Sequence, residues 1–255
     1  MSSSLFPSRW APLNPDIIQL YSMNTANGQK VSVCLEEMGL AYEAHLVNFH
    51  QGEQHEPEYL KINPNGKIPS LIDPQGPDGK PIALMESIVI LIYLADKTGM
   101  LLPQDIRQRM EHLQWLSFQA AHIGPMFGQF GHFYVYAPEK IQYAIDRYSM
   151  EVKRQLDVLD RELSKKEFIT GDEYSIADIS IWPWYGRLVL GKQYGAADFL
   201  QVGDYHNVLR WAKNLSSRPA VMRGERINRK SEIPNQYLLE RHSKTDFEAL
   251  DFDIY

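Results

Sequence analysis

Apolar positions in the first hundred residues alternate between short continuous runs and helical spacing. Residues 17–21 (Ile-Ile-Gln-Leu-Tyr) form a short run that predicts a buried strand. Apolar residues three or four apart then predict a helix that ends at Gly39. Residues 42–49 predict a second strand. A strand, a helix and a strand in this order form a βαβ unit, in which the two strands are parallel.

The remainder of this region predicts two further strands and two helices. A short helix is expected over 56–61, and strands over 68–72 and 81–84. Between the strands lies a turn rich in glycine and proline, which makes an antiparallel pair. Residues 87–97 have the spacing of a helix that ends at Gly99. The predicted order is therefore β-α-β-α-β-β-α.

Beyond Pro103 only helical spacing is present. One apolar face extends over residues 145–163, and Ser175-Ile176-Ala177-Asp178 has the spacing of a capping box at a helix start. Trp182-Pro183-Trp184 is expected to interrupt or kink that helix. A last helix is expected over 208–215. The sequence thus predicts an α+β protein whose second domain is entirely helical.

These patterns give the expected domain boundaries. An N-terminal extension covers 1–16, the α/β domain 17–98, a linker 99–104 and the helical domain 105–228. The final segment, 229–255, mixes charges with large apolar residues, which a wholly disordered tail would lack. We therefore expect it to pack on the body of the protein or on a partner subunit.

Composition and charge exclude several classes of function. The chain has 255 residues, a net charge of −6 and no dense run of Lys and Arg, so no nucleic-acid partner is expected. No apolar stretch is long enough to cross a membrane, and the first residues lack the apolar core of a signal peptide. The single cysteine, Cys34, cannot form an internal disulfide. These features indicate a cytoplasmic protein.

Metal and thiol chemistry of the chain itself are also not expected. The eight histidines are scattered without metal-ligand spacing, so no metal is predicted. Cys34 lies well inside the first predicted helix among apolar residues, and we interpret it as a packed core thiol.

Three short segments carry candidate chemistry. Glu86-Ser87 begins a predicted helix, where free N–H groups and the helix dipole favour an anion and the Glu carboxylate can accept from an ammonium. The pair therefore suits the head group of an amino acid. A simple helix cap also explains Ser87, and for this segment alone it is the simpler interpretation.

The second segment is Lys67-Ile68-Pro69 at a predicted strand start. A cis bond before the proline would expose the backbone of Ile68 for pairing with an extended peptide. An ordinary loop proline and surface lysine are the alternative.

The third segment is the turn 24–28, where Thr25 and Asn27 could stabilise a thiolate at a helix N-terminus. Helix capping by the same residues is the alternative. All three segments are expected at one edge of the same sheet, which favours a shared function over three separate structural roles.

With these motifs, the chain resembles the glutathione transferase family over residues 17–228. Lys67-Ile68-Pro69-Ser70-Leu71 and Glu86-Ser87 stand at the family's spacing, and the first hundred residues are similar to its thioredoxin-like domain. Residues 25–30, 131–138 and 176–184 more narrowly resemble the Nu class, the bacterial disulfide-bond reductase branch. The resemblance implies a homodimer with glutathione as co-substrate and no metal.

The resemblance also implies roles for single residues. Glu86 and Ser87 hold the γ-glutamyl group, the Ile68 backbone pairs with the cysteinyl part, and Thr25 and Asn27 face the sulfur as catalytic residues. The other implied residues are Lys67 and Gln54 near the glycyl end, and Arg147 reaching glutathione across the dimer. For Arg147, an ordinary helix-surface arginine is an equal alternative. Tyr21 is the fallback hydroxyl, with packing in the sheet as its alternative.

A pocket for the second substrate is expected along the glycine-containing stretch 124–136, although close helix packing explains that stretch equally well. The candidate lining residues are Met126, Phe130, His132 and Tyr136.

The implied reaction is nucleophilic. The thiolate of bound glutathione attacks a small disulfide or an organic hydroperoxide, and a second glutathione resolves the product. Conjugation to electrophiles is expected to be slow. Because the first turn has no cysteine, glutathione must supply the thiol. The alternative function is a non-catalytic glutathione-binding module of the same fold, with a regulatory or ligand-carrier role.

Overall fold

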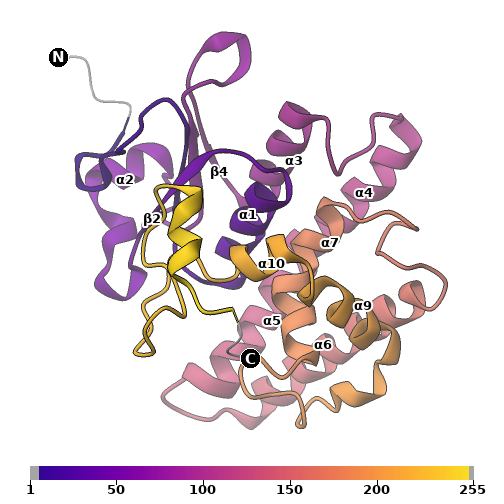
Figure 1. The fold of residues 1–255 in the computed structure, drawn as a ribbon. Coiled ribbons are helices and arrows are strands. Elements are labelled where there is room, and N and C mark those ends of the chain that lie inside the picture. The colour runs from indigo at the N-terminus through magenta and orange to yellow at the C-terminus, as the bar shows by residue number, and fades with distance from the viewer. Residues whose placement is uncertain (1–5, 253–255) are drawn as a thin grey trace. The chain divides into compact units, whose positions relative to one another are not determined.

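The computed structural model describes residues 6–252 and contains two compact units. The first consists of the described residues up to Thr98 together with those from Pro219 onward. The second consists of Gly99–Arg218. The helices and strands of both units are labelled in Figure 1.

A mixed sheet forms the centre of the first unit. Within residues 6–252 it has four strands in the order β2-β1-β3-β4. Their bounds are Ile18–Ser22 for β1, Tyr42–Leu46 for β2, Ser70–Asp73 for β3 and Ile82–Met85 for β4. β1 pairs in parallel with β2 and antiparallel with β3, which in turn is antiparallel to β4. The predicted βαβ unit and the antiparallel hairpin are both confirmed.

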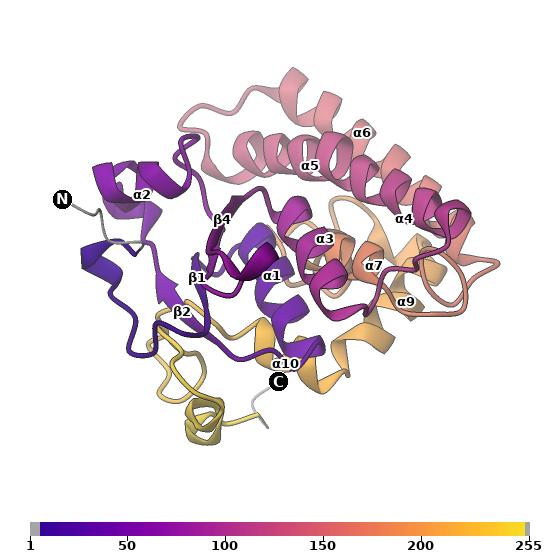
Figure 2. The same ribbon diagram turned by 90° about the horizontal axis from the view of Figure 1, so that it is seen from above.

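Helices of the first unit flank this sheet and carry the site. They are α1 (Ala26–Glu37), α2 (Pro57–Ile62), α3 (Ser87–Thr98) and α10 (Pro219–Gly224). α1 packs against both α3 and α10, as Figure 2 shows. Gly224 permits the close contact with α1, because an added Cβ would lie 2.6 Å from the Cα of Val33. The predicted order β-α-β-α-β-β-α is thus confirmed.

An aromatic core lies beside β1 in the same unit. It contains the buried side chains of Trp10, Tyr21, Val47, Tyr59 and Ile72. The indole N–H of Trp10 donates to the carbonyl of Leu46 at 2.8 Å. This core anchors the N-terminal segment to the sheet.

The second unit is helical, as predicted. Its longer helices are α4 (Ile106–Phe118), α5 (Gly124–Gly131), α6 (Gln142–Leu163) and α9 (His206–Ser216), with the shorter α7 (Ile176–Ile181) and α8 (Arg187–Val189). Ser175 and Asp178 form the predicted capping box at the start of α7. Residues 182–186 form a wider, π-helical turn after α7, so the expected interruption at Pro183 is present.

One boundary differs from the expected one. The helical domain was expected to extend to residue 228, whereas α10 and residues 225–228 belong to the first unit. α10 packs against α1, and the residues after it are held by Asn24, whose side-chain amide donates to the carbonyls of Glu225 and Ile227 at 2.7 and 2.8 Å. Polar contacts of this kind have no periodicity in the sequence.

The segment after residue 228 packs on the first unit beside β2 (Figure 1). Ala44 of β2 pairs with Arg241 through backbone hydrogen bonds of 2.7 and 3.0 Å. The Arg241 side chain is buried, with its guanidinium 3.8 Å from the centre of the Tyr42 ring. This segment therefore covers the outer edge of the sheet, an edge that would otherwise be open to pairing with another chain.

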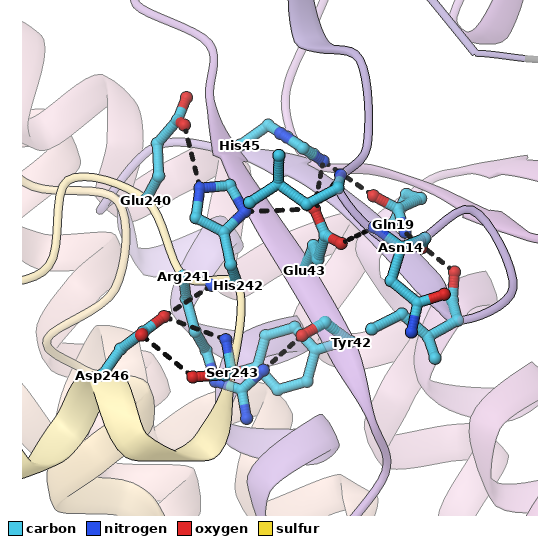
Figure 3. A network of polar contacts seen from close by, with 12 residues as sticks. Asn14, Gln19, Tyr42, Glu43, His45, Glu240, Arg241, His242, Ser243 and Asp246 are labelled. Atoms are coloured by element: carbon cyan, nitrogen blue, oxygen red, sulfur yellow. Dashed lines mark hydrogen bonds and ion pairs between the residues drawn. The ribbon is translucent and has the colours of Figure 1, made fainter.

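A buried polar network joins this segment to the sheet (Figure 3). We call Gln19, Glu43, His45 and His242 the β2 network. The carboxylate of Glu43 is fully buried and accepts from the backbone N–H of Leu13 and from Nδ1 of His242, both at 3.0 Å. His45 Nε2 lies 2.7 Å from Gln19 Oε1.

Candidate functional site

A cavity of about 220 Å³ lies in the first unit where the three predicted segments meet. Its lining residues are Asn27, Asn63, Asn65, Lys67, Ile68, Pro69, Glu86 and Ser87. The structure therefore brings together residues from the start of α1, from the loop before β3 and from the start of α3.

Glu86 and Ser87 form the wall of the cavity at the N-terminus of α3. Glu86 is exposed and has a φ of 68°, in the left-handed region that non-glycine residues rarely adopt. Its carbonyl accepts the N–H of Ile90 at 3.0 Å, so Glu86 directly precedes the helix. The first N–H groups of α3 have no carbonyl acceptor one turn earlier in the helix, and together with the helix dipole they favour an anion at this wall.

The loop before β3 forms a second wall. The Ile68–Pro69 bond is cis, as predicted. The Lys67 carbonyl accepts from the Tyr59 hydroxyl at 2.6 Å and from the Asn63 side chain at 2.7 Å, which fixes the loop. Within residues 6–252 the backbone N–H and C=O of Ile68 form no hydrogen bond, which leaves both groups available to an extended ligand.

The start of α1 forms the third wall. Thr25 caps the helix, and its Oγ1 accepts the N–H of Gly28 at 3.1 Å. Capping uses the oxygen as an acceptor, so the hydroxyl hydrogen can still be donated to another group. Asn27 lines the cavity and is half-buried. The capping interpretation of Thr25 and a functional one are therefore compatible.

Lys30 is a charged residue beside this cavity, and its role was not predicted from the sequence. It lies one turn after Asn27 in α1, it is 2% exposed, and its Nζ is 3.3 Å from Ser87 Oγ. Burial lowers its pKa to about 7, and the nearby charge of Glu86 partly opposes that shift. Asn63 was also not predicted as a site residue. Lys30 and Asn63 are polar residues in segments whose local patterns predict only a helix or a turn.

Three further residues of the first unit that the sequence singled out do not line the cavity. Tyr21 is fully buried in the aromatic core, where burial raises the pKa of its hydroxyl, so the packing interpretation describes its position. Cys34 is a free, fully buried thiol 3.8 Å from the sulfur of Met38, as expected for a core cysteine. Burial also raises its pKa, which disfavours the reactive thiolate. Gln54 is half-buried and does not line the cavity.

The remaining candidates belong to the second unit. Arg147 lies on the surface of α6 with its guanidinium 3.9 Å from the carboxylate of Glu151. Met126 is half-buried, whereas His132 and Tyr136 are exposed. Phe130 is fully buried.

The rings around Phe130 show why it is not available to a ligand. It stacks on Tyr134 and Phe199 with ring centres 5.0 and 6.2 Å apart, and it lies against Phe127 at 5.9 Å. Phe130 thus belongs to the core of its unit rather than to a pocket wall, which corrects the expectation for this residue. The apolar spacing that marked it is the same for a core helix as for a pocket.

Metal-binding clusters and membrane-spanning helices are absent from residues 6–252. No group of three or more His, Cys, Asp and Glu side chains there is placed to hold a metal ion. No helix in that range is long and apolar enough to cross a membrane.

Comparison with known proteins defines the family. The model of the glutathione S-transferase N-terminal domain matches residues 26–97, and that of the C-terminal domain matches residues 142–214. The disulfide-bond oxidoreductase YghU of Escherichia coli (strain K12) is 48% identical over 244 residues, which cover 93% of this chain and 84% of that protein. The chain therefore belongs to the glutathione S-transferase family.

Two solved structures show the same fold with ligand bound. A glutathione transferase from Burkholderia graminis, with two glutathione molecules per subunit, is 48% identical and has a TM-score of 0.83 over 88% of this chain and 93% of that chain. One from Pseudomonas putida, with one glutathione disulfide per subunit, is 47% identical and has a TM-score of 0.82 over 85% and 94%. The predicted fold and the prediction of an enzyme of this family are confirmed.

Proposed function

We propose that this enzyme binds glutathione in the 220 Å³ cavity and uses its thiolate to reduce small disulfides. The observation that carries the proposal is that three features line one cavity. They are the start of α3, which favours an anion, the backbone of Ile68, which forms no hydrogen bond within residues 6–252, and the start of α1. Relatives support it, since one is named a disulfide-bond oxidoreductase and the solved structures contain glutathione or its disulfide.

Each wall of the cavity suits one part of the tripeptide. At the start of α3, Ser87 and the first helical N–H groups bind the α-carboxylate of the γ-glutamyl residue, and Glu86 binds its ammonium. The N–H and C=O of Ile68 pair with the backbone of the cysteinyl residue. Lys67 is exposed at the edge of the cavity and binds the glycyl carboxylate. Gln54 contributes at that end only after a change in its side-chain position.

The sulfur then lies at the start of α1. The Thr25 hydroxyl and the Asn27 amide donate to it, and the helix dipole further favours the thiolate over the thiol. The thiolate attacks one sulfur of the substrate, forming a glutathione mixed disulfide and releasing the other sulfur as a thiolate, which takes up a proton. A second glutathione thiolate attacks this mixed disulfide, giving glutathione disulfide and the second substrate thiol.

The same thiolate can reduce an organic hydroperoxide. It attacks the terminal oxygen and releases the alcohol, and a second glutathione converts the resulting sulfenic acid to glutathione disulfide and water. Conjugation to electrophilic carbon is proposed to be slow. The motifs at 25–30, 131–138 and 176–184 support assignment to the Nu class.

A homodimer in the cytoplasm completes the proposal. The second unit exposes several apolar side chains, among them Met110, Tyr143 and Met150, which are 43%, 80% and 70% exposed. Such side chains favour subunit association, and Arg147 on the same unit would then reach the glutathione of the partner. The cytoplasm supplies reduced glutathione. Sedimentation at micromolar concentration tests the dimer.

The catalytic roles are tested with bis(2-hydroxyethyl) disulfide and glutathione, coupled to glutathione reductase. Thr25→Ala and Asn27→Ala are each expected to lower kcat by about tenfold or more, since each removes a donor to the thiolate. Asn214→Ala, another half-buried asparagine but in α9, is the control and should retain full turnover. Full turnover in both site variants would remove these residues from the mechanism.

The specificity is tested by comparing three substrates under the same conditions: the disulfide, cumene hydroperoxide and 1-chloro-2,4-dinitrobenzene. The disulfide is expected to react fastest and the aryl halide slowest. Retention of the wild-type protein on immobilised glutathione, without turnover of any of the three, would instead establish the non-catalytic binding module.

A further inference from the structure

Lys30 places a buried positive charge directly behind the wall that receives the γ-glutamyl head group. It is among the largest fully buried side chains in the described part of the chain. Lysine is almost never fully buried without a compensating partner, because removing the ammonium from water is costly. Its position in α1, which packs against α3, brings Nζ to within 3.3 Å of Ser87 Oγ.

This contact fixes the direction of the Ser87 hydroxyl hydrogen. When Lys30 is charged, its ammonium has three hydrogens and no acceptor, so Ser87 Oγ accepts from it. The hydrogen of Ser87 is then directed to another acceptor, and Ser87 lines the cavity. A serine held in this way is a hydrogen-bond donor toward the cavity, which suits a carboxylate and disfavours an ammonium.

We propose that Lys30 is a positioning residue that holds the Ser87 hydroxyl as a donor to the α-carboxylate of the γ-glutamyl group, with its own positive charge adding to the attraction. This inference rests on the proposed glutathione site. α1 then contributes to two parts of the site: its start faces the sulfur, and Lys30 helps to bind the γ-glutamyl group.

The arrangement links ligand binding to a proton. An added carboxylate favours the charged form of Lys30, whose pKa in the free protein is about 7. Above that pH, binding must take up a proton, so affinity falls as pH rises. α1 packs against α3 and α10, and these three helices carry other charged groups. They are Glu36 and Glu37 on α1, Asp96 and Lys97 on α3 with Glu86 directly before it, and Arg223 on α10 with Glu225 directly after it. Among these, Glu86 is the one whose charge shifts the pKa of Lys30.

The test uses S-methylglutathione, which keeps the head group and has no thiol to titrate. Its dissociation constant is measured calorimetrically between pH 6 and pH 9 for the wild type, Lys30→Met and Ser87→Ala, and for the double variant. Lys97→Met is the control, since Lys97 is another lysine of the first unit, does not line the cavity, and has its Nζ 2.8 Å from the carboxylate of Asp73.

Lys30→Met is expected to weaken binding by about 10- to 100-fold at pH 6 and to lose that deficit toward pH 9. Titration of the ligand's own amine is common to both proteins, so the ratio of their constants isolates Lys30. Ser87→Ala should cost much less in the Lys30→Met background than in the wild type, and Lys97→Met should bind as the wild type does. A Lys30→Met affinity within twofold of wild type at every pH would overturn the inference.

A measurement on the unmodified protein covers the case in which Lys30→Met does not fold. The ¹³Cε resonance of Lys30 is titrated by NMR with and without saturating S-methylglutathione. The ligand is expected to raise the pKa of Lys30 by about one unit or more, and an unchanged pKa would overturn the inference. Failure of the wild type to bind S-methylglutathione at millimolar concentration would instead overturn the proposed glutathione site itself.

Discussion

Two polar clusters in the first unit use similar charged groups in different surroundings. The cavity cluster contains Lys30, Glu86 and Ser87, and two of its three members line a 220 Å³ cavity. The β2 network instead directs its polar atoms toward one another and toward backbone groups, across the junction of β2 with the C-terminal segment (Figure 3).

Hydrogen bonding within the β2 network is closed. Gln19 donates its side-chain amide to the carbonyls of Asn14 and Ile17, both at 2.9 Å, so its Oε1 must be an acceptor. His45 therefore donates from Nε2, as the neutral imidazole. Glu43 receives donors from the N-terminal segment and from His242. A network satisfied in this way contributes to fold stability and offers nothing to a ligand.

This contrast gives a criterion for separating structural from functional polar groups in this protein. Where donors and acceptors are matched internally, loss of a group should destabilise the fold and leave ligand affinity unchanged. Where hydrogen-bonding capacity is directed into a cavity, loss of a group should change ligand affinity more than stability.

Glu43→Ala should have the largest effect. It removes a carboxylate with no exposed surface and leaves the backbone donors and His242 without their acceptor. We expect the free energy of unfolding to fall by about 3 to 5 kcal/mol, with the KM for glutathione unchanged. Urea unfolding and steady-state kinetics measure the two quantities. A loss below about 1 kcal/mol, or a raised KM, would contradict a purely structural role for Glu43.

Acid should destabilise the fold through His45. Burial lowers its pKa from 6.5 to about 4, with the negative charge of Glu43 opposing that shift and His242 adding to it. Below pH 6.5 the unfolded chain binds a proton here that the folded imidazole does not accept until about pH 4, so stability falls as pH falls through that window.

The contribution of this histidine is up to about 3 kcal/mol over that window. It is measured by urea unfolding at a series of pH values, with His45→Gln as the control because glutamine can donate to Gln19 but does not titrate. An equally steep decline in the control would show that other groups cause it.

Ser87→Ala tests the cavity cluster in the same way. It removes the hydroxyl donor to the ligand carboxylate, and we expect glutathione to bind about 10- to 30-fold more weakly. The free energy of unfolding should change by less than about 1 kcal/mol. Calorimetric titration and urea unfolding give the two values. A large stability loss with unchanged affinity would place Ser87 with the structural groups.

Cys34→Ala should have the smallest effect. The thiol is sealed in the core with its pKa raised by burial, so glutathione-dependent disulfide reduction should proceed at the wild-type rate. The lost packing should cost about 1 kcal/mol. A strongly reduced rate in a folded variant would show that the protein itself supplies a thiol.

Sequence patterns predicted most of the fold because burial imposes periodicity. The apolar face over 145–163 became α6, and the capping box at Ser175 formed as expected. α10 and residues 225–228 lie in the first unit, which their local pattern did not predict, because their placement depends on packing against α1 and on hydrogen bonds from Asn24, about two hundred residues earlier in the chain. Such contacts leave no local signal.

The site was predicted as far as its motifs are local. The cavity is lined by Glu86-Ser87, Lys67-Ile68-Pro69 and Asn27. These residues could be predicted because turns and helix starts have sequence signatures. Lys30 was not predicted as a site residue because a lysine in an amphipathic helix ordinarily lies on the solvated face. Phe130 was predicted to line a pocket, because apolar spacing along a helix does not distinguish a core residue from one in a pocket wall.

The most direct test of the account is an NMR titration of the wild-type protein with glutathione, following backbone amides. We expect saturable shifts at Asn27, Ile68 and Ser87, with little change at Glu43, His45 and His242. Shifts confined to the β2 network, or no change at Ile68 and Ser87 at saturating glutathione, would contradict it.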